Sequence, residues 1–137
     1  NVANKFNPMK EIIKGKRLIV VDDSIVRSTT IKKVIAMLRK AGAKEIHVRV
    51  ASPPIKSTCH FGVDMATLSQ LIAANKTNDE IRDLIEADSL AYLSVEGLEK
   101  ATKSKKSEYC KGCFTGKYPI PVQLEMDKLT LEKEINI

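Results

Sequence analysis

The chain has 137 residues, of which 43% are hydrophobic, and its 23 lysines and arginines outnumber 17 acidic residues to give a formal net charge of +6. Only 4% of the residues are aromatic and none is tryptophan, which predicts an aliphatic core. A chain of this length can fold around one core without disulfides, and its composition excludes wholesale disorder. No stretch approaches the roughly 20 apolar residues of a membrane span, so we expect a soluble, cytoplasmic protein.

The basic charge is partly concentrated in one segment, where six lysines fall between Lys100 and Lys117. A run of this kind is typical of a solvated linker. We therefore expect neither nucleic acid nor a membrane as a partner. The first residue is Asn1 rather than methionine, which suggests that the sequence begins inside a longer chain.

Residues 17–21 form a short apolar run rich in β-branched side chains, which predicts a strand buried on both faces of a parallel sheet. A polar stretch follows, in which Thr29 or Thr30 is expected to cap the next helix, and Gly42 suits the position just past its end. Apolar residues between them have the i, i+3, i+4, i+7 spacing of an amphipathic helix: Ile31, Val34, Ile35 and Leu38.

Alternating apolar residues predict a second strand at residues 46–50, which Pro53 and Pro54 follow. Strand, helix and strand make a βαβ unit. Thr67 with Gln70, and Thr77 with Glu80, have the spacing of capping boxes and predict two short helices. The elements expected in this second half are helices at 68–74, 78–87 and 95–101 and a strand at 90–93.

This order of elements predicts an α/β fold with a mostly parallel sheet and flanking helices. Residues 1–101 form the expected domain, and residues 102–137 a cysteine-containing C-terminal extension. That extension begins with a polar, lysine-rich connector and includes a C-x₂-C segment and a C-terminal tail. The tail has mixed periodicity that favours neither helix nor disorder.

Asp22 and Asp23 stand at the end of the first predicted strand, where open α/β sheets bind their ligands. Carboxylates accept hydrogen bonds from vicinal hydroxyls or hold a hard cation such as Mg²⁺. Backbone N–H groups at the following helix start can cradle a phosphate, helped by the hydroxyls of Ser24, Ser28, Thr29 and Thr30. A ligand that needs both chemistries is a phosphorylated sugar. The alternative is that the acidic pair only caps and solubilises a turn.

Three cysteines form the second candidate site. Cys110 and Cys113 make one C-x₂-C pair and Cys59 stands apart, an odd count that argues against a disulfide framework. Two ligand sets are chemically open. A structural zinc ion could use all three thiolates with His60, or a cubane iron–sulfur cluster could use the thiolates and a fourth from outside the segment. Three free buried thiols are the remaining possibility.

Residues 18–30 read Leu-Ile-Val-Val-Asp-Asp-Ser-Ile-Val-Arg-Ser-Thr-Thr, which resembles the loop that binds phosphoribosyl pyrophosphate (PRPP) in type I phosphoribosyltransferases. The Ser-Ile-Val-Arg variant resembles the glutamine amidophosphoribosyltransferase family, and the resemblance extends over about residues 2–122. It includes the runs Lys5-Phe-Asn-Pro-Met, Ala51-Ser-Pro-Pro-Ile, Gly62-Val-Asp-Met and Cys110-Lys-Gly-Cys-Phe-Thr-Gly-Lys-Tyr-Pro.

The resemblance implies roles for the residues of this loop. Asp22 and Asp23 would bind the ribose hydroxyls and help hold Mg²⁺. The stretch from Ser24 through Arg27 to Thr30 would enclose the 5′-phosphate of PRPP or of a purine nucleotide inhibitor. Lys5 matches a lysine of the family loop that closes over PRPP. The family usually has glycine at the position of Ser28, where a side chain narrows the loop or demands an unfavourable φ.

The resemblance also implies a larger protein. The segment would be the C-terminal part of an enzyme that converts PRPP, glutamine and water to 5-phosphoribosylamine, glutamate and pyrophosphate, the first committed step of purine synthesis. An N-terminal glutaminase domain would lie upstream, the complete protein would be a homo-oligomer, and this segment alone would be inactive.

In the branch of the family that carries a [4Fe-4S] cluster, Cys59, Cys110 and Cys113 match three of the four ligands, and the cluster is structural. Two alternatives remain open: another PRPP-binding phosphoribosyltransferase or regulator, and a zinc-stapled, non-catalytic binding module.

Overall fold

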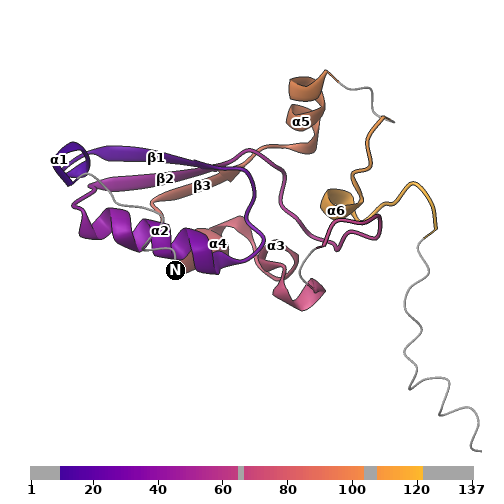
Figure 1. The fold of residues 1–137 in the computed structure, drawn as a ribbon, viewed down its shortest axis with the longest axis horizontal. Helices are drawn as coiled ribbons and strands as arrows, with labels where there is room; N and C mark the ends of the chain where they lie inside the picture. Colours follow the sequence, from indigo (N-terminus) through magenta and orange to yellow (C-terminus); the bar gives the residue numbers. More distant parts are fainter. Residues whose placement is uncertain (1–9, 65–66, 104–107, 122–137) are drawn as a thin grey trace, which may run out of the picture.

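Three parallel strands form the centre of the structure, a computed structural model that describes residues 10–64, 67–103 and 108–121 (Figure 1). They are β1 (Arg17–Asp22), β2 (Glu45–Val50) and β3 (Ser89–Tyr92), in the sheet order β1-β2-β3. Leu18 pairs with Ile46, and Val48 pairs with Leu90. The sequence therefore predicted the βαβ unit, the parallel sheet and all three strands of the described part within one residue of their bounds.

The helices surround this sheet unevenly. α2 and α4 pack against each other along one face of the sheet (Figure 1), whereas α5 and α6 lie beyond its carboxyl end. Their bounds are α1 (Lys10–Ile13), α2 (Ser28–Lys40), the 3₁₀ helix η2 (Leu68–Gln70), α3 (Ile72–Asn75), α4 (Asn78–Ile85), α5 (Val95–Thr102) and α6 (Gly112–Thr115).

The core is aliphatic, as the composition predicted, and it fills the space between the sheet and its two helices. Ile46 and Val48 of β2 are fully buried, as are Ile35 of α2 and both Ile81 and Ile85 of α4. These side chains form one cluster, so burying them stabilises the sheet and both helices together. Among the described residues, no helix has the length and apolar character that crossing a bilayer requires.

The expectation that the first strand is buried on both faces is wrong. Exposure alternates along β1, and Ile19 and Val21 are 70% and 71% exposed. The reason is that α2 and α4 cover one face only, and no strand of the described part pairs with the outer edge of β1. The same alternation buries Ile46, Val48 and Val50 of β2 beneath the helices.

The start of α2 also differs from the prediction. The helix begins at Ser28, and the side chain of its N-cap residue, Arg27, makes no capping hydrogen bond. Thr29 and Thr30 therefore lie inside the first turn and are not the cap. The other end was predicted correctly, since Gly42 follows the helix with a φ of 94°, a conformation that glycine adopts at low cost.

The predicted helix at residues 68–74 is broken in two. Leu71 is fully buried and has an extended backbone, so it separates η2 from α3. Thr67 makes no capping hydrogen bond, and its hydroxyl lies 3.1 Å from that of Ser69. The second capping box is confirmed: the Thr77 hydroxyl accepts a hydrogen bond from Glu80 N, and the Glu80 carboxylate accepts one from Thr77 N.

Candidate functional site

The loop between β1 and α2 is fixed to the core at three points. The Asp22 carbonyl accepts a hydrogen bond from Ala51 N at 2.8 Å, which extends the pairing of β1 with β2. Ile25 is only 3% exposed and packs into the core. The Val26 carbonyl accepts a hydrogen bond from Ile72 N at 3.1 Å. These contacts hold the polar residues of the loop at the carboxyl end of β1.

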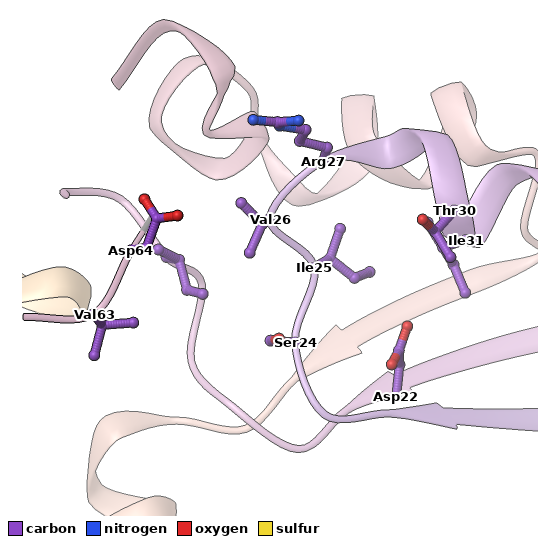
Figure 2. A pocket seen from close by; sticks show the side chains of 10 residues that line it. Asp22, Ser24, Ile25, Val26, Arg27, Thr30, Ile31, Val63 and Asp64 are labelled. Carbon is purple, nitrogen blue, oxygen red and sulfur yellow. The ribbon is translucent and has the colours of Figure 1, made fainter. Parts of the chain in front are cut away.

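A cavity of about 550 Å³ opens beside this loop (Figure 2). Its walls combine acidic, hydroxyl, guanidinium and aliphatic groups, the mixture that a polar ligand with an apolar edge requires. Figure 2 shows Asp22 and Thr30 on the strand and helix side, with Val63 and Asp64 across the loop from them. The lining residues are Asp22, Ser24, Ile25, Val26, Arg27, Thr30, Ile31, Ile55, Val63 and Asp64.

The two aspartates of the motif occupy different environments. Asp22 is half-buried and lines the cavity, whereas Asp23 is exposed and is not part of the cavity wall. Asp22 Oδ1 accepts a hydrogen bond from Asp23 N at 3.0 Å, and Asp23 Oδ1 accepts one from Ser24 Oγ at 2.8 Å. The carboxylates are therefore linked through neighbouring groups, and only the first faces the cavity.

The residues at the start of α2 border a second hollow. Ser28 and Thr29 line a neighbouring cavity of about 360 Å³, and Arg27 lines both cavities. Arg27 Nη2 donates a hydrogen bond to Gln70 Oε1 at 2.5 Å, which fixes the Arg27 guanidinium between the two cavities. Ser28 is not among the described non-glycine residues that have a positive φ. The unfavourable φ expected for a side chain at this position is therefore absent.

Asp64 was not singled out from the sequence, although it adds a second carboxylate to the cavity wall. It lies in a segment without regular structure between β2 and η2. The signal available was its place in the run Gly62-Val63-Asp64, which belongs to the resemblance but carries no chemistry by itself. Lys5, the remaining predicted site residue, lies outside the described residues.

The three cysteines come from two segments that the structure places side by side. Cys59 follows β2, while Cys110 and Cys113 flank the start of α6. Lys56 N and Ser57 N both donate to the Cys113 carbonyl, at 2.9 and 3.0 Å. Within the described part of the chain, no three His, Cys, Asp or Glu side chains form a group arranged to hold a metal ion.

The three thiols differ in burial and in their hydrogen bonds, and two of them accept hydrogen bonds from backbone amides. Burial raises the pKa of the Cys113 thiol, and negative charge on Cys59 or Cys110 raises that pKa further. Cys59 Sγ accepts a hydrogen bond from Phe61 N, and Cys110 Sγ accepts one from Gly112 N, both at 3.4 Å. Amide donors of this kind stabilise thiolates that bind iron–sulfur clusters.

His60, the fourth ligand of the alternative zinc set, makes other contacts. Its ring lies edge-on to Tyr118 with centroids 4.9 Å apart, and its Nε2 is 3.4 Å from Thr58 Oγ1. In the part of the chain that the structure describes, His60 and the three thiols do not form a group arranged to hold a metal ion.

Comparison with known proteins gives a consistent result. Residues 1–55 match the phosphoribosyl transferase domain family. Amidophosphoribosyltransferase of Methanocaldococcus jannaschii is 52% identical over 124 residues, which are 90% of this chain and 26% of that protein. The Synechocystis enzyme of the same name is 50% identical over 133 residues, 96% of this chain and 27% of that protein.

A solved structure of such a protein is also similar to this chain. Glutamine PRPP amidotransferase from B. subtilis, complexed with ADP and GMP, superimposes with a TM-score of 0.80 at 45% identity. The match covers 87% of this chain and 27% of that one, so the chain spans about a quarter of the length of the relatives it matches. The chain therefore corresponds in sequence and fold to the C-terminal phosphoribosyltransferase part of amidophosphoribosyltransferases.

Proposed function

We propose that the loop from Asp22 to Thr30 binds the ribose 5-phosphate part of PRPP. The observation that carries this proposal is the cavity of about 550 Å³ at the carboxyl end of β1, which Asp22, Ser24, Arg27 and Thr30 line together. A parallel sheet binds ligands at this end. The cavity wall offers carboxylates for hydroxyl groups, and guanidinium and hydroxyl groups for a phosphate.

Different residues of the loop would bind different parts of the ligand. Asp22 and Asp23 would bind the ribose hydroxyls and hold Mg²⁺, a hard cation that carboxylate oxygens prefer. The residues that lead into α2 would enclose the 5′-phosphate, because their N–H groups point out of the helix start and Arg27 adds positive charge. Bound Mg²⁺ would neutralise charge on the pyrophosphate leaving group. The loop itself would position the ribose for displacement at C1.

A purine nucleotide would use the same groups, because its ribose and 5′-phosphate repeat that part of PRPP. The B. subtilis relative has been solved with ADP and GMP, which supports nucleotide binding as a property of the family. We infer that a purine nucleotide inhibitor competes with PRPP for the loop.

The three cysteines would supply three ligands of a [4Fe-4S] cluster, with the fourth from outside this chain. The hydrogen bonds that join the two cysteine-bearing segments, and the amide donors to Cys59 Sγ and Cys110 Sγ, support this assignment. The cluster, when bound, would supply a structural link and no chemistry. It would join the segment after β2 to the extension that begins at residue 102.

The complete protein would be an amidophosphoribosyltransferase that uses PRPP, glutamine and water to make 5-phosphoribosylamine, glutamate and pyrophosphate in purine synthesis. Ammonia would come from a glutaminase domain outside this segment, so the segment alone would be inactive. The division at residues 101 and 102, the homo-oligomeric state and the cytoplasmic location stay predictions.

Isothermal titration of PRPP with Mg²⁺ tests the loop assignment. Replacing both carboxylates, in Asp22→Asn with Asp23→Asn, should weaken binding by about tenfold or more, because a charged hydrogen bond contributes about 1.5–3 kcal/mol. Asp83→Asn is the matched control, since Asp83 is exposed on α4 and forms a surface ion pair with Arg82. Undiminished affinity in the double variant would contradict the assignment.

Metal analysis tests the cysteine assignment separately. Chain purified without oxygen and supplied with ferrous iron and sulfide should bind both, and replacing Cys59 with serine should abolish uptake. Stoichiometric zinc with no iron or sulfide would instead support the zinc-stapled module.

A further inference from the structure

Tyr118 lies where the two cysteine-bearing segments meet. Its hydroxyl donates a hydrogen bond to the Thr58 carbonyl at 2.6 Å, next to Cys59 in the chain. Its ring lies edge-on to His60 and Phe61, with centroid separations of 4.9 and 6.0 Å. Tyr118 therefore contacts the segment after β2 through both its ring and its hydroxyl.

The same ring covers the turn that carries the other two thiols. A Cβ atom at Gly112 would lie 2.3 Å from Cδ1 of the Tyr118 ring, far closer than side chains tolerate. Gly112 sits between Cys110 and Cys113, so the absence of a side chain there lets the ring lie directly on the C-x₂-C turn. One aromatic residue thus bridges Cys59 and the Cys110–Cys113 pair.

Three further contacts hold this turn independently of any metal. The Cys113 carbonyl accepts hydrogen bonds from the amides of Lys56 and Ser57. Lys111, inside the C-x₂-C turn, forms an ion pair with Glu99 of α5. The turn is therefore connected by protein contacts alone to the segment after β2 and to α5.

We propose that Tyr118 is a positioning residue that holds Cys59 beside the Cys110–Cys113 turn before any metal or cluster binds. The role of this contact rests on the proposed cluster site, but the contact itself requires no metal. Ordering the two segments in advance lowers the conformational entropy that a cluster or metal must offset when it binds.

The test measures sulfur proximity in the complete 137-residue chain, kept reduced and stripped of metal with a chelator. A short bifunctional thiol reagent such as dibromobimane is added, and peptide mass mapping quantifies the products that join Cys59 to Cys110 or Cys113. Wild-type chain should form these products readily. Tyr118→Phe should form them about fivefold less, because a lost hydrogen bond costs about 1 kcal/mol.

Tyr109→Phe is the matched control, since Tyr109 belongs to the same segment and is 64% exposed. It should cross-link like the wild type. Gly112→Ala, which displaces the ring although Tyr118 keeps its hydroxyl group, should lower the yield as Tyr118→Phe does. Circular dichroism would show that the sheet and its helices are intact in each variant.

Equal cross-linking by the wild type and both Tyr118→Phe and Gly112→Ala would overturn the positioning role. Iron and sulfide uptake is then measured on the same samples, where Tyr118→Phe should load more slowly than Tyr109→Phe. If Tyr118→Phe cross-links less than the wild type but the wild type takes up no iron, the positioning contact is supported and only the cluster assignment is contradicted.

Discussion

Asp88 joins three elements through one carboxylate oxygen, and its removal should destabilise the fold measurably. Its Oδ2 accepts hydrogen bonds from Ile46 N at the start of β2 and from Arg39 at the end of α2, both at 2.6 Å. Asp88 N also donates to the Ile46 carbonyl. Because Ile46 is fully buried, Asp88→Ala would leave its amide without an acceptor.

The expected loss in the free energy of unfolding follows from these two hydrogen bonds. An unsatisfied buried donor costs about 1–3 kcal/mol. The ion pair with Arg39 contributes at most about 1 kcal/mol, because both side chains are about one-third exposed, 34% for Arg39 and 36% for Asp88. We expect Asp88→Ala to lower the free energy of unfolding by about 2 kcal/mol near neutral pH, measured by urea denaturation and circular dichroism.

The pH dependence gives a second test of the same contact. The Ile46 amide, and then Arg39, hold the pKa of Asp88 below its ordinary value. The stabilisation is therefore complete above the unfolded pKa of about 3.9 and is lost as the pH falls through the lower folded value. The difference between wild type and Asp88→Ala should shrink in that acidic range.

Asp83→Ala is the control, because Asp83 is 69% exposed and pairs with Arg82 at the surface. It should change the free energy of unfolding by no more than about 0.5 kcal/mol. The reasoning is refuted if Asp88→Ala costs no more than this control at neutral pH, or if its cost is unchanged in acid.

Three further predictions use the same denaturation assay. Thr77→Ala removes the capping box of α4 and should cost about 1 kcal/mol; no loss would mean that the cap is irrelevant. Ile85→Ala should cost about 2–5 kcal/mol because Ile85 is fully buried, and its neighbour Leu84, 37% exposed, should cost far less; equal costs would contradict the packing. Burial raises the pKa of Tyr92 to about 12, and its hydroxyl makes no hydrogen bond with the part of the chain that the structure describes. Tyr92→Phe should therefore be neutral or stabilising, and a loss above about 1 kcal/mol would contradict this.

The sheet and its main helix were predictable because their patterns are local and long. The stripe from Ile31 to Leu38 fixes the face of α2 that packs on the sheet, and Gly42 marks its end. The alternation in β2 likewise assigns Ile46 and Val48 to the core. These signals need no knowledge of what lies elsewhere in the chain.

The errors arose where tertiary contacts outweigh local signals. Leu71 is fully buried in an extended conformation, which breaks a helix that the capping pattern favoured. Ile19 and Val21 have the composition of a doubly buried strand, yet the helices of the described part cover only the opposite face. Burial of one residue and coverage of a sheet face depend on partners remote in sequence.

One part of the candidate site was predictable from local sequence, and another part depends on contacts between distant residues. The motif from Asp22 to Thr30 is contiguous, so the sequence placed its residues at a strand end and a helix start. Ile55 and Asp64 reach the cavity from a segment without regular structure, and Tyr118 reaches Thr58 across 60 residues. Spacing alone cannot predict contacts of this kind.

The central claim is that the loop between β1 and α2 binds a ribose phosphate, and backbone NMR tests it most directly. Adding PRPP with Mg²⁺ to ¹⁵N-labelled chain should shift the amide signals of residues 22–30 first, together with that of Asp64 across the cavity. Asp22→Asn with Asp23→Asn should suppress these shifts. Saturable shifts confined to α4 and β3, with the loop signals unmoved, would contradict the account.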